Sequence, residues 1–468
     1  MPFQFIDNSA IDRRSRKLIR SHVMKGINKG RTISRPSKKQ PIRQRVTPVT
    51  PDTELFDYTC ISGPSSVVEQ ISGPSMLSSI ATPVGRRFSS VRLPIELGPY
   101  ARSRLTQFLQ LVDESLYPPE FCYQPDYATS VYVEFMSIDA AFLHCTIALS
   151  TSFIDLFLGN QEVISRSAIP PEALMHIAHA FRLTNGKLSS HEALNNHTLA
   201  AVVCLSLHEQ LLRDYTTGRI HLAGLAKIVG LRGGLLQLPR ELAQKICRCD
   251  IDVALHDGTP PLLRYPGLSG DQVYATFGST RKHSRLADLH PDSALGCIAA
   301  DISTVADFLN SETRHRKLDP LTYQDLVVDL GYRLLEYRPP CGDESLDTLH
   351  EALHLALTAF MTTFIMHFGH QRQIRFDSLS IRLKDALHKP WTSEPANRPF
   401  LLWALVVGGI SEFDLGDYDW LLPEIRRAAD GLGIYDWESV RVVMLQYPWV
   451  KVLHDDQAKR LWGSASSF

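Results

Sequence analysis

Three side chains that could bind a metal ion, Glu172, His176 and His179, follow one another at helical spacing in the sequence PEALMHIAHAF. On a helix, residues three and four positions apart lie on the same face, so these side chains could converge. The order of these residues differs from the H-E-x-x-H arrangement of zinc proteases, and no further ligand can be identified from the sequence. The alternative to a metal site is that the histidines lie at the polar edge of a helical core. We therefore expect no metal and no cofactor.

The eight cysteines are scattered along the chain, and none forms a C-x-x-C pair. Cys247 and Cys249 are two positions apart, which on a helix turns their side chains in different directions. A shared zinc ion is therefore not expected, and the spacing favours packing residues. Most of the cysteines lie in apolar runs, which is typical of reduced and buried thiols in an intracellular protein.

Sequence motifs of enzymes are incomplete in this chain. The stretch GLSG at 267–270 is one residue short of the G-x-S-x-G nucleophile turn and lies in a loop rich in proline and glycine. The glycines of GLRGG at 230–234 and GLG at 431–433 do not match the fingerprints of phosphate-binding loops. The sequence therefore predicts a protein that is not an enzyme.

The elements that must position these residues are helices. Apolar residues recur at helical spacing, and the alternation typical of strands is scarce. We expect long helices at 137–159, with Ser137 or Asp139 as its N-cap, and at 195–212, 241–258 and 345–370. The longest apolar run, FLLWALVVGGI at 400–410, is shorter than the roughly 20 residues of a membrane span. The predicted fold is a large, all-α, multi-helical domain over 91–465, with no membrane segment.

The core of this domain is predicted from the apolar faces of the expected helices. The residues expected to be buried against one another are Cys145, Leu149, Leu199, Val203, Leu222, Leu225, Val229, Ile246 and Val253.

Positive charge is concentrated at the start of a chain that is nearly neutral overall. Residues 1–50 carry a formal charge of +11, and the rest of the chain carries −12. The first segment, 1–36, reads as an amphipathic basic arm with an apolar stripe from Ile11 to Ile27. The residues expected to serve nuclear import or phosphate contact are Arg13, Arg14, Arg16, Lys17, Arg20 and Lys25. Residues 37–90, rich in serine, proline and glycine, have the composition of a flexible linker.

The segment GRIHLAGLAKIVGLRGGLLQLPRELAQKICRCDIDVALHDGTPPLL at 218–263 resembles the signature of the fungal-specific transcription factor domain. In that family a His-x-x-Gly-Leu helix leads to an Arg-Gly-Gly turn and then to a helix with an aspartate. The matching residues are His221, Gly224, Leu225, Arg232, Gly233, Gly234 and Asp250. Stretches near 93–110, 135–150, 398–409, 432–450 and 460–463 resemble other parts of the family in the same order, and the opening arm is similar to the N-terminus of many fungal relatives.

The resemblance implies a fungal transcriptional regulator with a helical regulatory domain. Members that bind DNA carry a zinc binuclear cluster of six cysteines, but residues 1–59 contain no cysteine, so this DNA-reading module is absent there. The implied partners are other transcription regulators or a second copy, with weak, sequence-independent DNA contact through the arm, and the implied location is the nucleus. A helical interaction scaffold with no role on DNA is the alternative.

Overall fold

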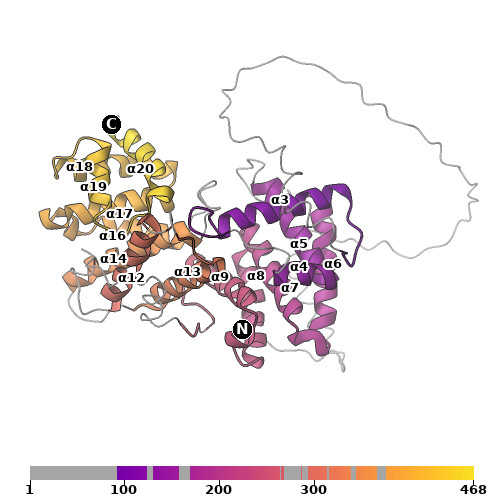
Figure 1. Ribbon diagram of the computed structural model, residues 1–468. Helices are drawn as coiled ribbons and strands as arrows, with labels where there is room; N and C mark the ends of the chain where they lie inside the picture. The colour runs from indigo at the N-terminus through magenta and orange to yellow at the C-terminus, as the bar shows by residue number, and fades with distance from the viewer. Residues whose placement is uncertain are drawn as a thin grey trace, which may run out of the picture. The chain divides into compact units, whose positions relative to one another are not determined.

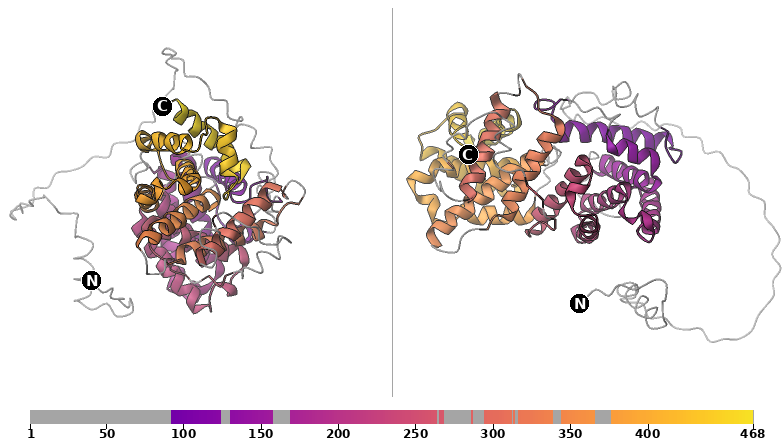
Figure 2. Two further views of the ribbon diagram at one scale, coloured as in Figure 1. Left: turned by 90° about the vertical axis from the view of Figure 1, so that its left-hand side faces the viewer. Right: turned by 60° about the horizontal axis from the view of Figure 1, so that its bottom comes forward.

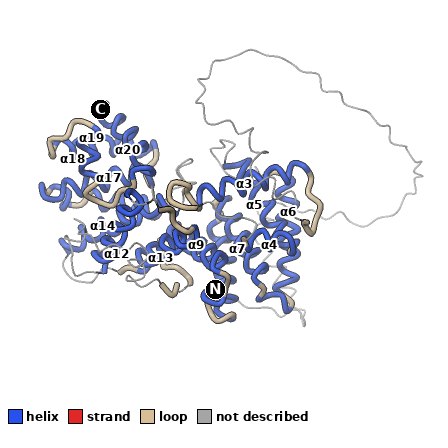
Figure 3. Tube along the Cα trace, viewed as in Figure 1, coloured by secondary structure: helices blue, strands red, loops and turns tan. Residues whose placement is uncertain are grey.

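The computed structural model describes residues 92–123, 130–157, 169–263, 265–267, 286, 294–311, 313, 316–338, 344–365 and 376–467. These residues form fifteen α-helices and contain no strand, which confirms the predicted all-α fold (Figure 3). In chain order the α-helices are α3 (Pro99–Leu116), α4 (Val131–Ile138), α5 (Ala140–Ser152), α6 (Pro171–Leu188), α7 (Asn196–Leu211), α8 (Tyr215–Leu231), α9 (Arg240–Asp257), α12 (Ala294–Ser311), α13 (Pro320–Glu336), α14 (Glu344–Ile365), α16 (Asp377–Leu387), α17 (Arg398–Ser411), α18 (Tyr418–Asp430), α19 (Trp437–Met444) and α20 (Lys451–Ser466).

The helix expected at 137–159 is interrupted, and Asp139 is the reason. Its carboxylate accepts a hydrogen bond from the backbone N–H of Phe142 at 2.8 Å, so α5 starts directly after α4 ends. An N-cap of this kind stabilises a helix by about 1 kcal/mol. Lys187 donates to the same carboxylate at 2.6 Å and ties the cap to the end of α6. Asp139 is thus the cap that the sequence indicated, whereas Ser137 lies inside α4, and α5 runs on into a π-helix, Phe153–Phe157.

No single helix in the described part of the chain has the length and apolarity that crossing a membrane requires. Helix α4 and the segment Ala140–Asp155 have the required length and apolarity only when they are counted together, and they are bent by 113° relative to each other.

Two groups of helices pack through one continuous core. In the first group α5 contacts α6 and α7, and α7 contacts α8; in the second, α17 contacts α14, α18 and α20. Between them α9 packs against α13 (Figures 1 and 2). A single cluster of buried apolar side chains includes residues from both groups. The helix α9 therefore joins the two groups, since it contacts α13 and also α16.

All nine residues predicted for the core are buried. Their exposed fractions run from 0% at Leu225 to 6% at Leu149, and all of them belong to the main apolar cluster. The periodicity of the apolar residues was therefore sufficient to identify the buried faces of these helices.

We predict that Leu225→Ala lowers the free energy of unfolding by about 2–5 kcal/mol, because it leaves a cavity in a packed interior. The matched control is Leu231→Ala on the same helix, where the side chain is 76% exposed and the change should cost less than about 0.5 kcal/mol. Urea denaturation of both variants measures the difference. Equal losses would mean that α8 does not pack through its Leu225 face.

Candidate functional site

The segment that runs from α8 through a turn to α9 contains the seven residues that match the family signature. Its turn requires glycine, because Gly233 and Gly234 have φ angles of 90° and 101°. A side chain with a Cβ rarely adopts such angles. The N–H of Gly234 donates to the carbonyl of Val229 at 2.9 Å, which satisfies an acceptor left open at the end of α8. The two glycines thus end α8 and reverse the chain toward α9.

Arg232 fastens this turn to the neighbouring segments. Its guanidinium donates hydrogen bonds only to neutral acceptors: the carbonyl of Leu194 at 2.9 Å, the side-chain oxygen of Asn196 and the carbonyl of Gln237 at 3.3 Å. These acceptors lie at the end of the short helix His191–Leu194, at the start of α7 and after the turn. Among the described residues Arg232 forms no ion pair, and carbonyl and amide oxygens solvate its charge.

The signature residues on α8 lie on different sides of the helix. Leu225 is fully buried, whereas Gly224 is exposed, and a methyl group added at Gly224 would meet no atom within 4 Å. His221 is partly buried, and its ring lies 5.8 Å from that of Phe181. Burial lowers the pKa of His221, so the imidazole is neutral at physiological pH. Packing inside the domain therefore explains Leu225 but not Gly224, and Nε2 of His221 is buried without a hydrogen-bond partner in the described part of the chain.

Asp250 is the signature residue whose buried carboxylate joins α9 to other segments. Its buried carboxylate accepts hydrogen bonds from the backbone N–H groups of Leu262 and Leu263, each at 2.8 Å, and from the hydroxyl of Tyr332 at 2.7 Å. Burial raises the pKa of Asp250, and the three hydrogen bonds act in the opposite direction. The residue fixes the segment after α9 and joins it to α13. Its role is structural, and no reacting group lies beside it in these contacts.

The metal candidates Glu172, His176 and His179 do not form a metal site. The Nδ1 atom of His176 lies 2.7 Å from Nδ1 of His144, which the sequence analysis missed. Two nitrogens bound to one tetrahedral zinc ion would be about 3.3 Å apart. His179 stacks on His144, and Glu172 makes no hydrogen bond or ion pair with either of its proposed fellow ligands. No three metal-ligating side chains in the described residues are arranged to hold a metal ion.

The His144–His176 pair is a neutral hydrogen bond between α5 and α6. Burial, together with the nearby imidazoles and Arg182, lowers the pKa of His144 to about 4, and burial also lowers that of His176. In the unfolded chain a histidine takes up its proton near pH 6.5. Between pH 6.5 and 4 the unfolded chain therefore binds more protons than the folded one. The contribution of these neutral histidines to the free energy of unfolding is fully present above pH 6.5 and is lost as the pH falls toward 4.

We predict that His144→Gln reduces this acid sensitivity. Lowering the pH from 7.5 to 5 should cost the wild-type pair about 1–2 kcal/mol through His144, after allowance for its partial exposure, and the variant should lose that much less. Urea denaturation at the two pH values measures the effect. His191→Gln, at an exposed position, is the control and should behave like wild type. If His144→Gln kept the full acid loss, the histidine pair would not be its source.

A serine, a histidine and an acid also meet in the core. Oγ of Ser152 lies 3.2 Å from Nε2 of His208, and Nδ1 of His208 lies 3.9 Å from Oε1 of Glu209, beyond hydrogen-bond distance. All three side chains are buried, and Ser152 is 0% exposed. A substrate could not reach this hydroxyl, so the arrangement supports packing and not acyl transfer.

Cys247 and Cys249 are both buried, and burial raises the pKa of each thiol to about 12. They are therefore unreactive thiols within the core, as their spacing suggested.

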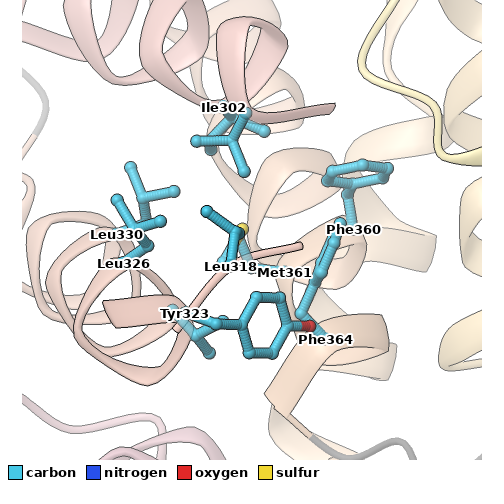
Figure 4. A pocket seen from close by; sticks show the side chains of 10 residues that line it. Ile302, Leu318, Tyr323, Leu326, Leu330, Phe360, Met361 and Phe364 are labelled. Atoms are coloured by element: carbon cyan, nitrogen blue, oxygen red, sulfur yellow. The ribbon is translucent and has the colours of Figure 1, made fainter. Parts of the chain in front are cut away.

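An apolar cavity lies between α12, α13 and α14 (Figure 4). Its volume is about 10 Å³, which is room for roughly one water-sized sphere. The lining side chains are aliphatic or aromatic: Ile302, Val305, Leu318, Tyr323, Leu326, Val327, Leu330, Phe360, Met361 and Phe364. A cavity of this size and lining is a gap in the packing, and a larger ligand would require the helices to move apart.

The basic residues Arg13, Arg14, Arg16, Lys17, Arg20 and Lys25 lie outside the described residues, as do the predicted segments 1–36 and 37–90. Comparisons of the chain with protein-family models, curated proteins and solved structures found no match. The resemblance to the fungal transcription factor domain therefore depends on the residues themselves.

Proposed function

We propose that this chain is a fungal transcriptional regulator without a zinc-cluster module of its own. The observation that supports the proposal is the signature segment from α8 to α9. The residues of its turn and the aspartate of α9 are those that hold this segment to the rest of the domain. A regulatory domain needs such a rigid framework but no catalytic group. The helical domain serves regulation and partner binding, and the controlled genes are of the kind found in a metabolic cluster.

In this proposal the basic arm directs the protein to the nucleus. The +11 charge of residues 1–50 is far above what solubility requires, and clustered lysine and arginine suit an import receptor or phosphate groups. Because the arm has no base-reading module, its direct affinity for DNA is weak, insensitive to sequence and steeply reduced by salt. Access to specific genes then comes through other regulators.

A second candidate function is a helical scaffold that binds proteins and has no role on DNA. The lack of cysteine in residues 1–59 favours it, because a chain without the zinc cluster depends on partners for any contact with specific DNA. Chromatin association separates the two candidates. A regulator loses it when residues 1–45 are deleted, and a scaffold never shows it.

The test is complementation of a deletion strain with a fluorescent fusion in which Arg13, Arg14, Arg16, Lys17 and Arg20 are all changed to Ala. We expect the fusion to move to the cytoplasm, because the import signal is lost, while the domain stays folded. Transcripts of a coherent gene set should fall or rise as in the deletion strain. Microscopy and transcript profiling measure the two effects.

The matched control changes Lys38, Lys39, Arg43 and Arg45 to Ala, which also removes basic residues from the first fifty but leaves the cluster intact. It should stay nuclear and restore the transcripts. A variant of the cluster that remained as nuclear as wild type would refute the role of the arm. If deletion of the gene changed no transcripts, the proposed regulatory function would be refuted.

A further inference from the structure

Two aspartates of α9, Asp250 and Asp252, are both buried, but their carboxyl groups have different surroundings. Asp250 accepts three hydrogen bonds. Asp252 is only 9% exposed, and its Oδ1 atom is buried without a hydrogen-bond partner in the described part of the chain. A carboxyl group in such a place is costly when it is charged and much less costly when it carries a proton. The fold around Asp252 is therefore sensitive to the protonation of this residue.

Asp252 faces the turn between α7 and α8. Cys249, Asp252 and His256 are three and four positions apart, so they share one face of α9. The sulfur of Cys249 accepts a hydrogen bond from Gln210 of α7 at 3.3 Å. The ring of His256 stacks on that of Tyr215, the first residue of α8, with the ring centres 3.7 Å apart. Asp252 lies between these two contacts and therefore faces the end of α7 and the start of α8.

The turn itself is strained. Arg213 is exposed and has a φ angle of 58°, and no other described residue except glycine has a positive φ. A residue with a Cβ disfavours this conformation. The N–H of Arg213 donates to the carbonyl of Gln210 and that of Asp214 to the carbonyl of Glu209, each at 2.9 Å. A strained, exposed turn is a place where a folded protein opens locally.

The ionisable groups around Asp252 differ in the pH at which they change charge. Burial raises the pKa of Asp252 to about 7, and the cation of Arg248 acts in the opposite direction. Burial also raises the pKa of Cys249 to about 12 and that of Tyr215 above its ordinary value, and it lowers the pKa of His256 to about 4. These three groups are therefore neutral between pH 6 and 8, whereas Asp252 changes its charge there. The other charges that act on this cluster come from Arg213 in the turn, Asp257 at the end of α9 and Asp377 at the start of α16.

We propose that the proton on Asp252 is a pH-sensitive latch for the turn between α7 and α8. The protonated carboxyl group stays buried, and the turn is closed. A carboxylate that has released its proton to the solvent gains hydration when the turn and the first residues of α8 move away from α9, so the turn opens more often. The inference goes beyond the proposed function and does not depend on it, because it rests on the contacts of α9 with α7 and α8.

The latch weakens as the pH rises. In the open turn a hydrated aspartate has an ordinary pKa near 4. Between pH 4 and 7 the closed form therefore binds more protons than the open form, and the preference for the closed form is lost as the pH rises through this range. From pH 6 to pH 8 the equilibrium constant for opening should rise about tenfold. This direction is opposite to that of the histidine pair between α5 and α6.

The test is hydrogen exchange of the full chain at pH 6 and pH 8, read by mass spectrometry and corrected for the intrinsic pH dependence of exchange. Peptides from residues 209–222 report on the turn, and peptides from α17 serve as the internal control. We expect the opening constant of the turn to rise about tenfold and that of α17 to stay unchanged.

Variants connect the effect to the proton. Asp252→Asn cannot ionise, so the turn should open equally at both pH values. Glu134→Gln, at an exposed position on α4, is the control and should keep the tenfold rise. Arg213→Gly relieves the strain, so it should lower the opening constant at both pH values and leave their ratio unchanged.

Three results would overturn the proposal. The first is an equal opening constant of the turn at pH 6 and pH 8 in the wild type. The second is an equal rise in the turn and in α17, because the whole domain would then loosen. The third is a tenfold rise that persists in Asp252→Asn. The first two comparisons use the wild type, so they decide the question even if Asp252→Asn does not fold.

Discussion

The buried carboxylate of Asp250 is the interaction on which the rest of the structure depends. A carboxylate in an apolar interior is costly unless its oxygens are bonded, and here it accepts three hydrogen bonds. Two of them fix the segment after α9, and the third comes from Tyr332 of α13. Nearby, Gln244 of α9 donates to the carbonyl of Leu321 at 2.7 Å, and Arg248 donates to Gln324 at 2.7 Å. Polar bonds thus supplement the apolar packing between α9 and α13.

A rigid attachment of α9 also determines how α8 is presented. The turn that joins the two helices is closed by its glycines and held by Arg232, so α8 keeps a fixed orientation. One side of α8 completes the core, and the other side is left exposed. The signature residues therefore explain the stability of the segment.

Local patterns in the sequence predicted the fold well. Apolar periodicity identified the nine core residues, and Asp139 was one of the two cap candidates, the other being Ser137, which lies inside α4. The family resemblance indicated a turn at Arg232, Gly233 and Gly234, and both glycines there have a positive φ. The break at Asp139 itself was not foreseen, since the apolar residues continue through it without a proline or glycine.

Contacts between distant segments could not be predicted. His144 precedes His176 by 32 residues, and Asp250 precedes Tyr332 by 82, so neither pairing leaves a pattern in the sequence. The exposure of Ile220 and Leu231 was also hidden, because an apolar helix reads as buried on every side. Which side of α8 is covered depends on the packing of α7 and α9, which only the folded structure defines.

The most direct test of this account is a double-mutant cycle between Asp250 and Tyr332, measured by urea denaturation. Tyr332→Phe removes only the hydroxyl that donates to Asp250. In the wild-type background it should lower the free energy of unfolding by about 1–3 kcal/mol, and much less in the Asp250→Asn background, with a coupling energy of about 1 kcal/mol or more. Losses that add to within about 0.3 kcal/mol would show that the two residues act independently, and would contradict the central role of Asp250.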